Sequence, residues 1–187
     1  ANSEVRFNIH GVFYTKTTNK DGVADLGIML RPGTYILTAY NPVTGEEKGF
    51  NITVKSLIVQ NDLTKYYLNA SRFQATIYNK DGSLAVNKEV TFNINGVFYT
   101  KTTDENGVAS LGIALRPGSY IITTIFDGLA MGNNVVVIPT LVTKDLNMKY
   151  LDGSDFTAQT LDGQGKPLSN QNVSFNVNGV FYHKVTD

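Results

Sequence analysis

Side chains capable of chemistry are few in this sequence, and their spacing matches no catalytic motif. The two histidines, His10 and His183, do not recur at equivalent positions of the sequence repeat, and neither has a repeated serine or acid partner. The acidic clusters at residues 104–107 (DENG) and 152–155 (DGSD) offer oxygens of the kind that calcium prefers, but they lack the spacing of a twelve-residue calcium loop. We therefore expect these clusters to form turns, and we expect no catalytic, cofactor or metal site.

Three asparagines lie in the Asn-x-Ser/Thr pattern that accepts N-linked glycans, namely Asn51, Asn69 and Asn172. Such a modification takes place on an extracellular surface. Because a chain rich in asparagine and threonine also produces this pattern by chance, the three positions give only mild support for secretion. We treat them as candidate glycosylation sites.

One long stretch of sequence occurs twice and begins a third time, so the chain contains a repeat. It starts at Asn95 as NGVFYTKTTDENGVASLGIALRPGSYIITT, is nearly the same from His10, and begins again at Asn178. The glycines of the three opening turns, at positions 11, 96 and 179, are 85 and 83 residues apart. Repetition at a fixed period is typical of a tandem array.

The turn residues of the repeat predict antiparallel strands. Asn95-Gly96 favours a type I′ turn, whose twist matches that of the strands on either side. Apolar and polar residues alternate over 90–94, as on a strand with one buried face. The proline and glycine of 116–118 (RPG) favour a type II turn before a further strand at 119–126. No segment has the period of an amphipathic helix, so we expect an all-β chain.

The repeat divides the chain into three parts with almost no linker. Residues 1–57 correspond to the later part of a unit, residues 58–140 form one complete unit, and residues 141–187 repeat the opening of the unit. Neither junction is a flexible Gly/Ser segment. We expect the last strand of one unit to continue into the first strand of the next, as in a stiff rod.

Composition excludes several classes of function. The formal net charge is zero and no basic stripe occurs, so nucleic acid and anionic membranes are poor partners. Cysteine is absent, so the fold uses neither disulfides nor a thiolate metal site. The longest apolar run, at 135–138, is too short to insert into a membrane, and no signal peptide is visible at Ala1.

The motifs FNINGVFYTKTT, DENGVASL and LRPGSYIIT occur in this order, and the order is repeated. They resemble the immunoglobulin-like repeats of large adhesin-like surface proteins of methanogenic archaea. The resemblance covers the whole chain and implies tandem Ig-like (Greek-key) β-sandwich repeats of about 84 residues. It also implies a secreted glycoprotein of the cell surface. The DENG and LRPGSYII segments are similar, over part of the unit, to the prealbumin-like stalk repeats of bacterial surface adhesins.

The similarity to stalk repeats implies a candidate isopeptide bond between a buried lysine and an asparagine. Lys101 and Asn134 are the candidates, because each has a counterpart in the first copy, Lys16 and Asn51. Apolar surroundings lower the pKa of a lysine and make its amine nucleophilic. However, threonine occupies the strand position at which the stalk family has its proton-shuttling acid. A solvent-exposed lysine is the alternative interpretation.

We expect a non-enzymatic stalk or spacer of an extracellular cell-surface adhesin, with neighbouring repeats of the same chain as its first partners. Two alternatives remain open at this point. Exposed tyrosines in a binding module can contact a host or microbial surface glycan or protein. The incomplete end pieces can also complete each other between copies, head to tail, as in a filament subunit.

Overall fold

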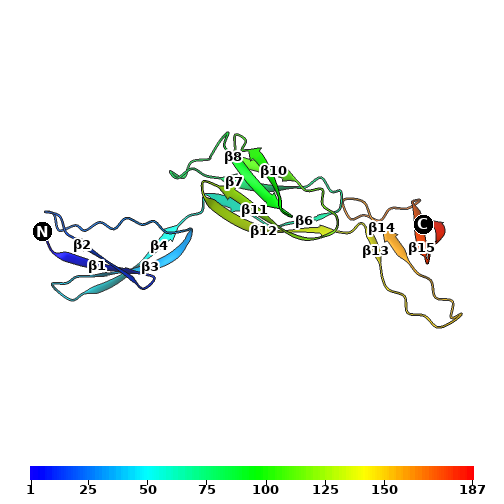
Figure 1. Cartoon of the computed structure of the whole chain (residues 1–187), viewed down its shortest axis with the longest axis horizontal. Coiled ribbons are helices and arrows are strands. Elements are labelled where there is room, and N and C mark those ends of the chain that lie inside the picture. Colours follow the sequence, from blue (N-terminus) through cyan, green and yellow to red (C-terminus); the bar gives the residue numbers. More distant parts are fainter. The chain divides into compact units, whose positions relative to one another are not determined.

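The computed structural model describes all 187 residues and contains sixteen strands and no helix, which confirms the predicted all-β class (Figure 1). No part of the chain forms a helix that is long and apolar enough to cross a membrane. The contacts divide the chain into two units, Ala1–Ser56 and Leu57–Asp187. Residues 58–140 of the second unit are referred to as the complete copy, and residues 141–187 as the C-terminal copy.

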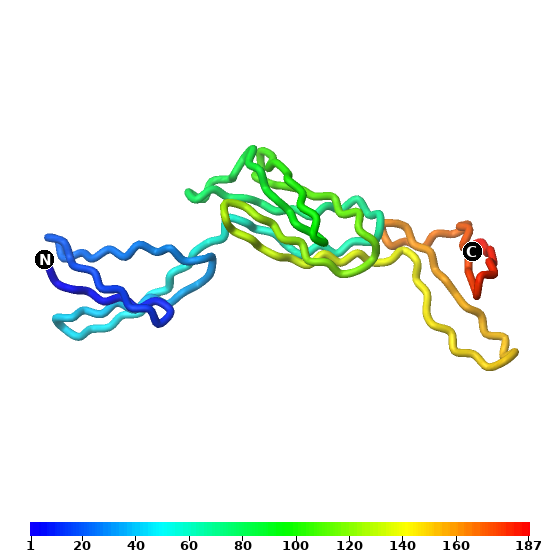
Figure 2. The backbone as a smooth tube through the Cα atoms, in the orientation of Figure 1, coloured from blue at the N-terminus to red at the C-terminus, as the bar shows by residue number.

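The complete copy is a two-layer sandwich, and its path alternates between the layers (Figure 2). One sheet has the order β10-β7-β5 and the other the order β6-β12-β11-β8-β9. All pairs are antiparallel except β6 with β12. Consecutive strands that change sheets in this way define an Ig-like Greek-key sandwich, as predicted. The strands are β5 (Ile58–Gln60), β6 (Leu63–Tyr66), β7 (Arg72–Ile77), β8 (Glu89–Ile94), β9 (Val97–Thr102), β10 (Val108–Gly112), β11 (Gly118–Phe126) and β12 (Leu129–Ile138).

The core of the complete copy lies between these two sheets. Phe73 of one sheet meets Phe92 of the other edge to face, with ring centroids 5.9 Å apart, which is a favoured aromatic geometry. The alternation that predicted a strand at 90–94 places its apolar residues in this core. The buried apolar residues are Ile58, Phe73, Ala75, Ile77, Ala85, Val90, Phe92, Ile94, Ala109, Leu111, Ile113, Ile122, Val135 and Val137.

The same hairpin opens the repeat in all three copies. Asn95 and Gly96 have φ of 53° and 78°, and the corresponding residues of the other copies also have positive φ at both positions. Positive φ at both central residues confirms the predicted type I′ turn. The hairpin register is also shared, since Phe92 lies opposite Tyr99 just as Phe7 lies opposite Tyr14.

A threonine, buried in the first two copies and half-buried in the third, fastens the open end of each hairpin. In the complete copy, the Thr103 hydroxyl accepts a hydrogen bond of 2.9 Å from the Lys88 amide. Thr18 accepts an equivalent bond from the Ser3 amide, at 3.0 Å. In the C-terminal copy, Thr186 accepts one from Gln171, also at 3.0 Å. The side chain thus satisfies a backbone donor that the hairpin ladder leaves unpaired.

The segment before β11 differs from the predicted turn type. A type II turn needs φ of about +80° at its glycine, whereas Gly118 has φ of 156°. The Tyr120 hydroxyl instead donates a 2.8 Å hydrogen bond to the Arg116 carbonyl. Tyr35 makes the same bond to Arg31, at 2.7 Å. This tyrosine corner is a feature of Ig-like sandwiches. It holds the chain before β11 in place, and the prediction of a type II turn there was wrong.

The N-terminal unit contains a single sheet of order β2-β1-β3-β4. Its strands are β1 (Glu4–Ile9), β2 (Val12–Thr17), β3 (Gly33–Tyr40) and β4 (Glu47–Val54). Residues 23–28 correspond to β10 but form no strand and are drawn as coil in Figure 1. The reason is that β10 pairs only with β7, and this unit has no counterpart of β7.

The C-terminal copy consists of two hairpin-like pairs, β13 with β14 and β15 with β16. The strands are β13 (Leu141–Thr143), β14 (Ala158–Thr160), β15 (Asn172–Val177) and β16 (Val180–Val185). Residues 146–149 correspond to β6 but form no strand. Since β6 pairs only with β12, and this copy has no counterpart of β12, the absence has the same physical cause.

Candidate functional site

The most connected polar cluster of the complete copy centres on Asp62. Its carboxylate accepts hydrogen bonds from the Asn134 amide at 2.8 Å, the Asn134 side chain at 3.1 Å and the Asn133 side chain at 2.7 Å. The backbone bond from Asn134, followed by the two side-chain bonds, lowers the pKa of Asp62 below its ordinary 3.8. The cluster links Asp62, the residue that precedes β6, to Asn133 and Asn134 of β12.

Lys65 is the one buried charged residue of the complete copy. Its ammonium group donates hydrogen bonds to the carbonyls of Ile113, at 2.9 Å, and Ser71, at 3.1 Å. Burial lowers the pKa of Lys65 below its ordinary 10.5. Both partners are backbone carbonyls, so the lysine ties the end of β10 to the loop before β7 and has no carboxylate or carboxamide to react with.

The structure does not bring together the isopeptide candidates Lys101 and Asn134. Strands β9 and β12, which carry them, are separated in the sheet by β8 and β11, and three strand spacings amount to roughly 14 Å. Lys101 lies opposite buried Val90, whereas Asn134 lies opposite exposed Ile121. Opposed residues share a face, so the two side chains point to opposite faces of the sheet.

The three candidate glycosylation sites have different surroundings. Asn51 on β4 and Asn172 on β15 are exposed. The side-chain nitrogen of Asn69 donates a 2.6 Å hydrogen bond to the Gly163 carbonyl, and its oxygen accepts one from the Ser71 amide. A glycan on Asn69 would replace a hydrogen of this engaged amide nitrogen, so the geometry favours Asn51 and Asn172 as acceptors.

The acidic clusters act as turn caps. Asp104 accepts hydrogen bonds of 2.9 Å from the amides of Asn106 and Val108. Asp152 accepts bonds from Ser154 and Lys149, which lower the pKa of its carboxyl group. These oxygens therefore satisfy backbone donors, as the turn interpretation expected.

Ser174 Oγ lies 2.8 Å from His183 Nδ1, a contact that the sequence analysis did not predict. The two residues are opposed on β15 and β16, and both are exposed. A catalytic serine needs a base that is itself oriented by a third group. No hydrogen bond orients the other ring nitrogen of His183, so this contact is a cross-strand pair on the surface.

The second strand of each hairpin lies at a sheet edge or hairpin edge and exposes apolar side chains. Phe98 on β9 is 65% exposed, and Phe13 and Phe181 at the same position of the other copies are also exposed. Tyr99 is likewise exposed, at 38%, and lies opposite Phe92 on the neighbouring strand. A sequence pattern does not predict which strand lies at the edge of a sheet, because the edge is defined by how the strands pair.

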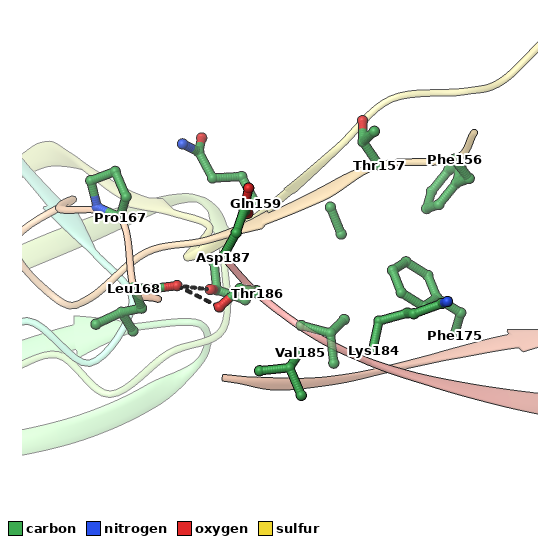
Figure 3. A pocket seen from close by; sticks show the side chains of 13 residues that line it. Phe156, Thr157, Gln159, Pro167, Leu168, Phe175, Lys184, Val185, Thr186 and Asp187 are labelled. Atoms are coloured by element: carbon green, nitrogen blue, oxygen red, sulfur yellow. Dashed lines mark hydrogen bonds between the residues drawn. The ribbon is translucent and has the colours of Figure 1, made fainter. Parts of the chain in front are cut away.

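A cavity of about 460 Å³ opens in the C-terminal copy between β14 and the β15–β16 hairpin (Figure 3). Phe156 and Phe175 face each other across it, edge to face, with centroids 5.8 Å apart. This is the geometry of Phe73 and Phe92 in the complete copy. The cavity is thus a sandwich core with one side open.

The complete copy and the C-terminal copy meet through two turns. Besides the bond from Asn69 to Gly163, the turn at 162–166 packs on Tyr66 so closely that a Cβ on Gly165 would lie 2.4 Å from the tyrosine ring. The equivalent glycine of the complete copy, Gly82, has free space around it. Only Pro139 and Thr140 separate β12 from β13. The junction is therefore short and packed.

No protein-family model and no curated protein matches the chain. Among solved structures, domains 4–9 of the surface layer protein SbsC align with a TM-score of 0.29 and 15% identity, covering 100% of this chain and 35% of that one. Fibronectin(III)-like modules of CbhA from Clostridium thermocellum align with a TM-score of 0.32 and 14% identity, covering 73% of this chain and 78% of that one.

The bacterial integrin-binding protein invasin gives a TM-score of 0.31 and 17% identity, covering 93% of this chain and 43% of that one. The chain spans about a third of the length of the surface-layer structure. Similarity at these TM-scores carries no information about function.

Proposed function

We propose that this chain is a non-catalytic stalk segment of an extracellular, cell-surface adhesin, in which sandwich repeats act as spacers. The observation that carries the proposal is the junction between the complete copy and the C-terminal copy. Strand β12 continues into β13 after two residues, and the turn at 162–166 packs on Tyr66 and Asn69. A short packed junction restricts bending between successive repeats, as a spacer requires.

Spin-label distances test this stiffness directly. The chain has no cysteine, so Thr100→Cys and Asn176→Cys, both at exposed positions, label the two copies specifically. We expect a narrow distance distribution in the doubly labelled chain. Gly165→Ala introduces a clash with Tyr66 and is expected to broaden the distribution.

Gly82→Ala is the matched control, because Gly82 has a similar φ, +85° against +80°, but contacts nothing within 4 Å. The control substitution should leave the distribution narrow. A distribution that is already broad in the parent, or that Gly165→Ala leaves unchanged, contradicts a stiff stalk. Antibody labelling of intact cells of the source organism tests the surface location separately.

The exposed aromatic residues on the hairpin edges favour a second candidate function, a module that binds a surface glycan or protein. Phe98 and Tyr99 lie side by side in sequence on β9 and recur in all three copies. Aromatic rings with exposed faces bind sugar rings and apolar protein surfaces. Binding on a glycan array that Phe98→Ser abolishes, while Tyr120→Phe leaves it intact, supports the module over the spacer.

We further propose that Asn51 and Asn172 carry N-linked glycans in the native protein. Intact mass of the natively produced chain, before and after enzymatic removal of N-glycans, checks this. Occupancy at Asn69 instead would mean that the junction described above is absent in the modified protein.

A further inference from the structure

Arg6 lies between two aromatic rings on one face of the sheet of the N-terminal unit. Its guanidinium carbon is 4.8 Å from the centroid of the Phe13 ring and 4.8 Å from that of the Tyr40 ring, and the two ring centroids are 6.1 Å apart. The neighbouring residue Phe7 is the counterpart of buried Phe92 and points to the inner face. Successive side chains of a strand point to opposite faces, so the three residues of this Arg6 cluster lie on the outer face.

The outer face is open to solvent even where both sheets of a sandwich are present. In the complete copy, Phe98 occupies the position of Phe13 and is 65% exposed, compared with 54% for Phe13. The exposure of the Arg6 cluster is therefore a property of this face and does not depend on a second sheet. The guanidinium covers only part of Phe13, which leaves ring surface free for a ligand.

A cavity of about 510 Å³ lies at the Arg6 cluster, within the same unit. Arg6 and Tyr40 line it together with Glu4, Glu47 and part of the loop 41–46. Sites for small ligands have volumes of about 300–1,000 Å³ and combine apolar surface with a few placed polar groups. The cavity has both properties, since its charged side chains surround an aromatic ring.

The loop at this cavity is longer than its counterpart in the complete copy. Residues 41–46 separate β3 from β4, whereas only Asp127 and Gly128 separate β11 from β12. The longer loop has a defined conformation, because the Asn41 amide donates a 2.8 Å hydrogen bond to the Glu46 carbonyl. A wall that is ordered before binding lowers the entropy cost of holding a ligand.

The charged groups of the cavity have no partners within the protein. Arg6 makes no hydrogen bond and no ion pair, and the only ion pair of the chain joins Lys80 to Asp127. A guanidinium has five N–H donors in a fixed plane, and the two rings hold that plane in position. Glu4 and Glu47 add carboxylate acceptors to the same cavity. The cavity thus presents free donors and free acceptors around an aromatic surface.

The Arg6 cluster occurs in one copy of the repeat. Thr91 and Ser174 occupy the position of Arg6 in the other copies. Ile125 occupies the position of Tyr40 in the complete copy, where it lies opposite Thr91. The fold does not need the arginine or the tyrosine, because the complete copy forms its sandwich without them.

The composition of the cavity favours an uncharged carbohydrate. The C–H face of a sugar ring packs on an aromatic ring, and sugar hydroxyl groups both accept hydrogen bonds from a guanidinium and donate them to carboxylates. The carboxylates of Glu4 and Glu47 outnumber the one guanidinium, so an anionic sugar or a nucleic acid is repelled. A purely apolar ligand would bury these charged groups without partners.

We propose that the Arg6 cluster binds a neutral sugar residue of a surface polysaccharide. One face of the sugar packs on Phe13 and Tyr40. Arg6 donates hydrogen bonds to sugar hydroxyl oxygens, and Glu47 accepts hydrogen bonds from sugar hydroxyl groups. This site goes beyond the stalk function, because a spacer needs no ligand. It also differs from binding at the hairpin edges, because Arg6 and Tyr40 have no equivalents in the other copies.

A printed array of neutral, uronic-acid and sulfated oligosaccharides tests the ligand class with the full chain. We expect binding to neutral hexose oligosaccharides, and none to the acidic ones or to a lysine-rich peptide on the same array. Arg6→Thr, Tyr40→Ile and Glu47→Ala each introduce the residue of the complete copy, so the sheet should tolerate them. Each should weaken binding about tenfold in a titration with the best neutral ligand.

Phe98→Ser is the matched control, because it changes the exposed aromatic residue at the Phe13 position of another copy. It should leave the affinity unchanged, whereas binding at the hairpin edges predicts a loss. Chemical-shift changes in the ¹⁵N-labelled chain locate the ligand, and we expect them at Arg6 Nε and the amides of residues 41–46 and not on β9. The same spectra show whether each variant keeps the fold of β1–β4.

Failure to bind any neutral oligosaccharide at millimolar concentration overturns the proposal. Binding to acidic oligosaccharides or to the lysine-rich peptide alone also overturns it, as does binding that Phe98→Ser abolishes or that folded Arg6→Thr and Tyr40→Ile variants retain. If one variant does not fold, the other variants and the chemical-shift map give the answer. None of these outcomes bears on the stiffness of the junction at Gly165, so the sugar site and the stalk function can fail independently.

Discussion

Replacing Phe73 by alanine should remove one of the two largest side chains in the core of the complete copy. Phe73 is 1% exposed and packs edge to face on Phe92. A buried phenylalanine removes about 150–250 Å² from water, which at about 25 cal/mol per Å² corresponds to about 4–6 kcal/mol. With the residual burial of alanine subtracted and a cavity left behind, we expect a loss of about 3–5 kcal/mol in the free energy of unfolding.

Hydrogen exchange resolved by mass spectrometry is the suitable assay, because it reports on each part of a multi-unit chain separately. Amides of β7, β8 and β11 should exchange about a hundred to several thousand times faster in Phe73→Ala, since each 1.4 kcal/mol of opening free energy is tenfold in rate. Amides of β1–β4 belong to the other unit and should be unaffected.

Phe156→Ala is the matched control for this experiment. It removes the same side chain from the same aromatic geometry, but at a position that is 47% exposed. Because only about half of the Phe156 side chain is buried, we expect its loss to lower the free energy of unfolding by about 1–2 kcal/mol. A cost of less than about 1 kcal/mol for Phe73→Ala, or equal costs at the two positions, would refute the assignment of Phe73 to a closed core.

Three further predictions concern single polar groups of the complete copy. Thr124 is fully buried and its hydroxyl has no hydrogen-bond partner, so Thr124→Val should raise the unfolding free energy by about 1 kcal/mol, measured by urea denaturation. Tyr120→Phe removes the bond to the Arg116 carbonyl and should lower it by about 1 kcal/mol in the same assay. The pKa of Asp62 is lowered on folding. Its stabilising contribution is therefore complete above the ordinary value of 3.8 and is lost as the pH falls through the lower folded value. The unfolding free energy of Asp62→Asn should therefore fall less steeply than that of the parent below about pH 4.

Each of these predictions has an outcome that contradicts it. Destabilisation by Thr124→Val would mean that the hydroxyl has a partner, such as a buried water. An unchanged urea midpoint in Tyr120→Phe would mean that the tyrosine corner contributes only through ring packing. If the unfolding free energies of the parent and of Asp62→Asn fell in parallel as the pH is lowered, the ionised Asp62 carboxylate would not be hydrogen-bonded to Asn134 in solution.

The candidate contacts of the complete copy depended on pairings that local sequence does not encode. The alignment of copies related Asp62 to Asp145 and Asn51 to Asn134, but it did not show that Asp62 and Asn134 touch. That contact spans 72 positions and requires the parallel pairing of β6 with β12. In the same way, Lys101 and Asn134 recur in the sequence, yet the strand order places them on opposite faces of one sheet.

Features that depend on only a few neighbouring residues could be predicted from the sequence. Asn95-Gly96 accepts positive φ at both positions, so it forms the type I′ turn in any setting that permits a hairpin. Alternating apolar residues then select the face of the strand that will be buried. These features are the same in every copy, because their causes lie within each hairpin.

Which of the repeated segments become strands depends on tertiary pairing and could not be predicted from the repeat. Residues 23–28 (VADLGI) and 108–113 (VASLGI) differ at one position, yet only the second segment contains a strand, β10. The backbone groups of a strand need a partner to bond with, and β7 supplies it in the complete copy alone. A strand is thus a property of a pair of segments, and the sequence of either one leaves it undetermined until the other is in place.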